Sequence, residues 1–166
     1  VFGSLTQSLG KPAIIGTLID ITERFKAIEK MQESEKALKI SNERFLLVAK
    51  ATKDAIWDWN IINNKIWGNE VFSKLFNIAA GTEISFETFL QKQHPQDKAA
   101  IAENLQQAIN QKKSLVTEQF RFILNEQETL TFNNRAYIIY DNNGKAIRML
   151  GAMQDITEQT RNEQQI

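Results

Sequence analysis

Few residues of this chain have the type and spacing that catalysis or metal binding requires. The sequence holds no cysteine and one histidine, His94, which stands next to Pro95. Without cysteine there is no disulfide, no thiolate metal ligand and no cysteine nucleophile. A lone histidine beside a proline is typical of a loop or a helix cap. No Ser-His-Asp set, carboxylate pair or glycine-rich phosphate loop can be placed. We therefore expect a module that is not an enzyme and binds no metal.

The composition is that of a soluble globular chain. The 166 residues are 42% hydrophobic and 24% charged, with a formal net charge of zero. This length suits one domain with connecting segments. The charge balance gives no reason to expect a nucleic-acid partner, and no apolar run approaches the ~20 residues of a membrane-spanning helix. Val1 does not begin a signal-peptide pattern. We expect a cytoplasmic piece without direct membrane contact.

A long charged segment near the N-terminus has the pattern of a helix. Residues 17–67 contain neither glycine nor proline, and residues 23–53 are rich in Glu, Lys and Ala. Apolar residues recur there at spacings of three, four and seven, which favours a helix. Polar Glu35 and Asn42 interrupt this seam, so it predicts either a weak coiled coil or a solvated single helix. Ser41 could cap a second helix, with a joint near that residue.

The rest of the chain alternates between strand and helix patterns. Residues 55–61 have a period of two, which indicates a strand. The other expected strands are 65–68, 115–124, 130–140 and 146–154, and short helices are expected at 71–78 and 86–91. A longer helix is expected from Asp97, as its N-cap, to about residue 110. Asn143-Gly144 predicts a two-residue hairpin turn. This order favours an α+β fold, with an antiparallel sheet and its helices packed on one face.

One segment occurs nearly twice. Residues 10–23 match residues 144–158, and from Gly16 onward the offset between the two copies is a constant 135 residues. Each copy has a strand pattern followed by a charged helical stretch. Such a repeat predicts a tandem array in which this chain holds one whole unit and the tail of the unit before it.

The repeated motif resembles a known family. Gly-x-x-x-Asp-Ile-Thr-Glu, after a three-strand end and before a charged helix, resembles the carboxyl-terminal motif of PAS domains. The strand 55–60 and the helix start 94–97 resemble the same domains, particularly those of bacterial sensor histidine kinases. The resemblance covers residues 41–160 and the fragment 1–23. One departure is the hairpin 125–129, which lacks the Asp-Gly that these domains usually carry, so we expect a looser or longer turn there.

The resemblance implies the architecture and the domain boundaries. It implies a PAS fold, with a five-stranded antiparallel sheet, helices packed on one face and an N-terminal linker helix. Residues 1–22 would be the tail of a preceding PAS repeat, 23–40 a helical linker, 41–157 the PAS domain and 158–166 the start of an exit linker. We expect residues 1–22 to be an orphan strand, either disordered or paired with another sheet edge.

Strand alternation and the family register together place a set of side chains on the face toward the helices. The glycine of this set is Gly151. The other members are Trp57, Trp59, Phe120, Phe122, Phe132, Asn134, Met149 and Met153. Their aromatic rings are large enough to fill a small cavity without a ligand. The alternative is a pocket for an apolar or aromatic ligand, oriented by Asn134 and the indole N–H groups.

Two further sets of residues suit signal relay. Asp155, Ile156 and Thr157 stand where PAS domains pass signals out of the sheet. Asp155 and Glu158 have the spacing of a reciprocal helix cap, which is the purely structural reading. The expected dimer interface runs along the long helix, through Ile28, Met31, Leu38 and Phe45. The partners would be a second copy and the neighbouring PAS and output domains of the same chain.

No cofactor is expected. Light-oxygen-voltage domains use a cysteine, which this chain lacks, and a glutamine at the position that Met153 occupies here. The helix 97–110 holds no histidine for haem. The predicted function is a non-catalytic sensory and dimerisation PAS module, in a parent protein such as a histidine kinase. The rivals are a small-molecule receptor and a small α+β enzyme that uses a buried carboxylate.

Overall fold

The computed structural model describes residues 2–164, and the chain divides into two compact units. The first unit extends to Leu46 and the second begins at Leu47. The first unit holds strand β1 (Phe2–Ser8), strand β2 (Lys11–Thr17) and most of helix α1 (Thr22–Thr52). The second unit holds every other element. Within residues 2–164, no helix combines the length and the apolar character needed to cross a membrane.

Residues 2–17 form a paired hairpin, so the expected orphan strand is wrong. β1 and β2 pair antiparallel from Phe2–Thr17 to Ser8–Lys11. The turn residues Leu9 and Gly10 both have positive φ, at 51° and 76°. Such a pair of left-handed residues gives a two-residue turn whose twist matches that of the strands. The backbone groups of the two strands therefore hydrogen-bond to each other. No residue of either strand is fully buried.

Helix α1 is continuous over 31 residues, and Ser41 does not start a second helix. The Asp20 carboxylate accepts a hydrogen bond from the Thr22 backbone N–H at 2.9 Å, which satisfies a free donor at the helix start. Ala49 is the only buried residue of α1. The helix therefore gains little from packing within this chain.

The second unit is built on a five-stranded antiparallel sheet with strand order β4-β3-β7-β6-β5. The bounds of its strands are β3 (Ala55–Asn60), β4 (Lys65–Gly68), β5 (Leu115–Asn125), β6 (Glu128–Tyr140) and β7 (Ala146–Asp155). β3 follows α1 in the chain and β7 precedes the last helix. These two strands are neighbours in the sheet and pair from Ala55–Met153 to Asn60–Arg148. The predicted sheet is thereby confirmed.

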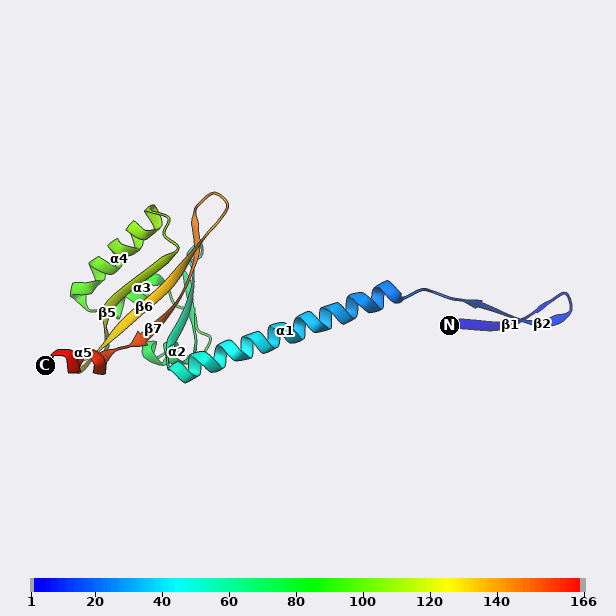
Figure 1. The fold of residues 1–166 in the computed structure, drawn as a ribbon, viewed down its shortest axis with the longest axis horizontal. Helices are drawn as coiled ribbons and strands as arrows, with labels where there is room; N and C mark the ends of the chain where they lie inside the picture. Colours follow the sequence, from blue (N-terminus) through cyan, green and yellow to red (C-terminus); the bar gives the residue numbers. More distant parts are fainter. Residues whose placement is uncertain (1, 165–166) are drawn as a thin grey trace. The chain divides into compact units, whose positions relative to one another are not determined.

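Three helices connect β4 to β5 and pack on one face of the sheet (Figure 1). They are α2 (Glu70–Phe76), α3 (Phe86–Gln91) and α4 (Pro95–Asn110), and a fourth helix, α5 (Thr157–Gln164), follows β7. Asp97 was predicted to cap α4, but the cap is His94, whose Nδ1 accepts from the Gln96 N–H at 3.3 Å. Asp97 lies in the first turn and instead binds Arg121 of β5, with N–O distances of 2.6 and 3.0 Å. It therefore fastens α4 to the sheet edge.

Two hairpin turns differ from expectation. The β5–β6 connection is not longer, because Asn125 pairs with Glu128 and its side chain accepts from the Gln127 N–H at 2.9 Å, but the strand register shifts between Ile123 and Asn125, just before the turn. Asparagine thus replaces the missing Asp-Gly. The β6–β7 connection is one residue longer than predicted: the Asp141 N–H bonds to the Lys145 carbonyl around three residues. Gly144 supplies the positive φ there, at 77°.

Candidate functional site

The inner face of the sheet carries the eight side chains that the sequence assigned to it. Each is at most 8% exposed. They come in pairs from four strands: Trp57 and Trp59 (β3), Phe120 and Phe122 (β5), Phe132 and Asn134 (β6), Met149 and Met153 (β7). Their predicted side of the sheet is therefore confirmed. Their role in binding a ligand stays a prediction.

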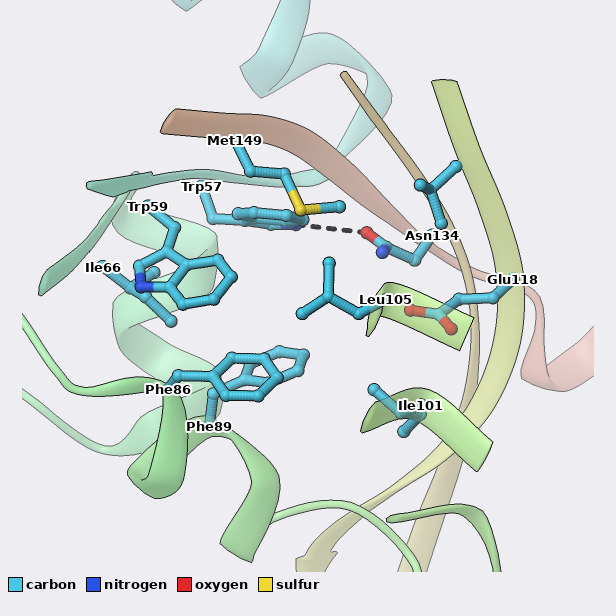
Figure 2. A pocket seen from close by; sticks show the side chains of 11 residues that line it. Trp57, Trp59, Ile66, Phe86, Phe89, Ile101, Leu105, Glu118, Asn134 and Met149 are labelled. Atoms are coloured by element: carbon cyan, nitrogen blue, oxygen red, sulfur yellow. Dashed lines mark hydrogen bonds between the residues drawn. The ribbon is translucent and has the colours of Figure 1, made fainter. Parts of the chain in front are cut away.

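A small cavity lies between this face and helices α3 and α4. Its volume is about 20 Å³, which is room for roughly one water molecule. The predicted residues that line it are Trp57, Trp59, Asn134 and Met149. The remaining lining residues are Ile66, Phe86, Phe89, Ile101, Leu105, Val116 and Glu118. Figure 2 shows these side chains converging from strands and helices, with Leu105 in the middle of the ring.

The other four predicted residues fill the core beside the cavity. Phe122 and Phe132 pack edge to face with ring centroids 5.8 Å apart. Phe120 lies 6.3 Å from Phe132, and Met153 is fully buried. These offset and edge-on contacts are the arrangements that aromatic rings prefer. Four of the eight predicted pocket residues therefore line the cavity, and the other four are packed in the core beside it.

Aromatic rings form one side of the cavity. The rings of Trp59 and Phe86 are stacked, with centroids 4.6 Å apart, and Phe89 lies 6.1 Å from Phe86. The sequence predicted the short helix over residues 86–91, but it did not predict that the side chains of Phe86 and Phe89 point toward the sheet. Their spacing of three residues, one helical turn, was the signal that could have placed both on one face.

Both indole N–H groups are bonded within the chain, and their part in orienting a ligand stays a prediction. The Trp57 Nε1–H donates to Asn134 Oδ1 at 3.2 Å. The Trp59 Nε1–H donates to Asn64 Oδ1, also at 3.2 Å. Asn64 lies in the β3–β4 turn and accepts from the Phe86 N–H as well, at 3.1 Å. This asparagine therefore joins the turn to the start of α3.

Glu118 is the one charged residue of the cavity lining, and sequence reasoning missed it. It lies on β5 between inward-facing Val116 and Phe120, so strand alternation turns it toward the helices. Burial raises the pKa of its carboxyl group, and hydrogen bonds from the Asn134 and Asn104 side chains offset part of that rise. None of the ion pairs in the described part of the chain involves Glu118.

The junction of β7 and α5 is held by a hydrogen-bond network. Asp155 Oδ1 accepts from the backbone N–H of Thr157 at 2.9 Å and from the Thr157 hydroxyl. The Thr157 oxygen accepts from the Thr131 N–H of β6 at 2.9 Å. Ile156 adds a backbone bond, from its N–H to the Thr131 carbonyl at 2.8 Å. All three predicted junction residues are therefore brought together, and Thr157 rather than Glu158 completes the cap.

The residues predicted to form a dimer interface are exposed along α1. The exposed fractions of Ile28, Met31, Leu38 and Phe45 lie between 46% and 72%. Their role in an interface stays a prediction. Over residues 2–164, no three acidic, histidine or cysteine side chains group closely enough to hold a metal ion.

Comparisons with known proteins give one family. The profile of the PAS fold matches residues 65–153, from β4 almost to the end of β7. No curated protein matches significantly.

Several solved structures share this fold. A sensory box histidine kinase/response regulator from Burkholderia thailandensis is 21% identical, with a TM-score of 0.62 over 73% of this chain and 90% of that one. The N-terminal domain of a diguanylate cyclase with a PAS/PAC sensor, from Marinobacter aquaeolei, is 15% identical, with a TM-score of 0.54 over 64% of this chain and 98% of that one. A PAS domain from Colwellia psychrerythraea is 20% identical, with a TM-score of 0.50 over 69% of this chain and 98% of that one. At these identities the likeness concerns the fold alone.

Proposed function

Because this chain belongs to the PAS-fold family, we propose that it is a non-catalytic sensory module that relays a conformational signal from helix α1 to helix α5. Domains of this fold occur in the histidine kinase and the diguanylate cyclase named above. We propose the same kind of setting here, in which neighbouring PAS and output domains of one chain are the partners.

One observation carries the relay: the incoming and outgoing segments meet on two adjacent strands. Helix α1 ends at Thr52, and Ala55 of β3 pairs with Met153 of β7. Only two residues after Met153, Asp155 begins the network that holds α5 to β6. A shift of the end of α1 therefore has a short path of hydrogen-bonded backbone to the start of α5. Packed elements with two discrete arrangements can pass such a shift onward.

We further propose that two copies associate through α1. The helix exposes an apolar seam that its own chain does not cover, at the four residues named above. Polar Glu35 and Asn42 within the seam weaken the pairing, which keeps alternative packings close in energy. A relay between domains requires such a marginal interface.

One experiment can test both the dimer through α1 and its coupling to the junction of β7 and α5. Ile28→Glu with Leu38→Glu should convert a dimer to monomer in sedimentation velocity, because both charges would enter the seam. In the same variant, hydrogen exchange at the Ile156 and Thr160 amides should become faster, at least about threefold, if α1 and α5 are coupled. Lys36→Glu with Lys39→Glu is the matched control on the same helix. A monomeric wild-type chain, or unchanged exchange in α5 of a separated variant, contradicts the relay.

The N-terminal hairpin supports a tandem arrangement. Gly3 pairs with Gly16 in β1–β2, as Ala136 pairs with Gly151 in β6–β7. Gly16 and Gly151 are the equivalent residues of the sequence repeat. We propose that β1 and β2 correspond to β6 and β7 of a preceding PAS unit, and that α1 corresponds to the helix that α5 begins.

A second candidate function is a small-molecule receptor. The observation that favours it is the cavity, with aromatic rings on one side and with Glu118 and Asn134 as its polar groups. Pockets of this composition are typical of small-ligand sites. The ligand would then supply the signal that the junction relays.

A further inference from the structure

The cavity holds a carboxyl group that has hydrogen-bonding amides beside it but no cationic partner among residues 2–164. Glu118 points into the ring of side chains shown in Figure 2. Its polar neighbours are two amides, Asn134 and Asn104, and it takes part in none of the ion pairs among residues 2–164. An inward carboxylate without a cation is costly in a folded protein. A cationic group at this place would remove that cost.

The opposite side of the cavity also suits a cation. The rings of Trp57, Trp59, Phe86 and Phe89 all line it, and in Figure 2 the Trp57 ring lies on one side of Leu105 and the phenylalanine rings on the other. The negative faces of aromatic rings attract ammonium groups, most strongly where water is excluded. Asn134 is 2% exposed and its Oδ1 already accepts from Trp57. Its position beside Glu118 fixes the polar end of the cavity.

We propose that this cavity binds a small organic ammonium ion, with Glu118 as the counter-ion and the aromatic rings around its apolar part. The inference rests on the receptor candidate described above and names its ligand class. It does not depend on the dimer or on the relay.

The size of the cavity indicates what must move. About 20 Å³ is too small for an organic cation, and the side chain at the centre is Leu105 of α4. Leu105 is only partly buried, whereas Ile101 and Ala108 on the same helix are buried. The Leu105 side chain can therefore move aside while its helix stays anchored. A ligand of similar shape would take its place.

Isobutylammonium is a suitable probe because its apolar part has the shape of a leucine side chain. Isobutanol is its neutral counterpart. Both are titrated into the whole chain while the indole N–H signals of Trp57 and Trp59 are followed by NMR. With five heavy atoms, an affinity of about millimolar is the expected scale. We expect isobutylammonium to bind the wild-type chain at least about tenfold more tightly than isobutanol.

Two variants separate the contributions. Glu118→Gln should remove the preference for the cation and leave isobutanol binding within about twofold. Leu105→Ala should strengthen binding of the cation, because the probe then fills an existing space, and Leu105→Ala with Glu118→Gln should again show no preference. Glu128→Gln, an exposed glutamate on β6, is the matched control and should bind like the wild type.

The outcomes are distinguishable. Equal binding of the two probes, or undiminished cation binding in Glu118→Gln, overturns the inference and leaves a receptor for neutral ligands. No binding by the wild-type chain up to about 50 mM overturns the inference even if Leu105→Ala binds, because the native cavity is then closed. If neither probe binds either chain, the receptor candidate fails as well, and only the relay remains.

Discussion

At the scale of single residues, Glu118 should make the stability of the domain depend on pH. Its pKa in the folded state is raised, chiefly by burial. A raised carboxyl pKa favours the protonated form, so the contribution of Glu118 to stability is complete below its unfolded value and is lost as pH rises through the folded value. We expect Glu118→Gln to be more stable than the wild type at pH 7.5 and to lose that advantage near pH 4. Thermal unfolding of both proteins across this range measures the difference.

The same variant supplies its own control at low pH, where glutamine and protonated glutamate have almost the same polarity and shape. Glu128→Gln on the exposed end of β6 should change the melting temperature little at any pH. A Glu118→Gln protein that is less stable at pH 7.5 would show that the charged carboxylate is well bonded in the native state. It would also weaken the case for a missing cation.

At the scale of elements, the Thr157 side chain connects α5 to the sheet by hydrogen bonds. It is 7% exposed, and its hydroxyl bonds to Asp155 and accepts from the Thr131 N–H. Thr157→Val keeps the shape but leaves the Thr131 donor unpaired, which costs about 1–3 kcal/mol. We expect lower stability in urea unfolding and faster hydrogen exchange at the Ile156 amide.

Thr160→Val is the matched control, since the Thr160 hydroxyl donates to the carbonyl of Ile156, the residue just before α5, at 2.9 Å and not to the sheet. A cost below about 0.5 kcal/mol is expected there. If both substitutions cost the same, the hydroxyl of Thr157 has no special part in fixing α5, and the relay needs another anchor.

At the scale of the whole molecule, we expect the second unit to stay folded when the N-terminal hairpin is removed. The sheet, its helices and the buried core all belong to the second unit. No residue of β1 or β2 is buried. We expect deletion of residues 1–21 to leave the melting temperature of the domain within about 3 °C, because almost no buried apolar surface is lost. A larger fall would show that the hairpin stabilises the domain directly.

The local periodicity of the sequence predicted the strands, and together with the family resemblance it predicted the five-stranded sheet and its inner face. In β3, apolar residues at alternate positions place Trp57 and Trp59 on one side whatever the partner strand is. The repeated Asp-Ile-Thr motif likewise marked the end of β7, because its side chains bond to backbone groups within two residues. Such features depend on neighbours in the chain and can be inferred without coordinates.

The tertiary structure decided which side chains meet across the cavity. Phe86 and Leu105 come from helices whose rotation on the sheet is set by packing, and Glu118 lies inward against the usual preference of a charged residue. Turn lengths were missed for a different reason: Asn125 and Asp141 accept from backbone N–H groups two to four residues further along the chain, and such local bonds are compatible with turns of more than one length. The sequence alone thus determined the fold and the side of each strand, whereas long-range packing determined the cavity, its volume and the carboxyl group that lines it.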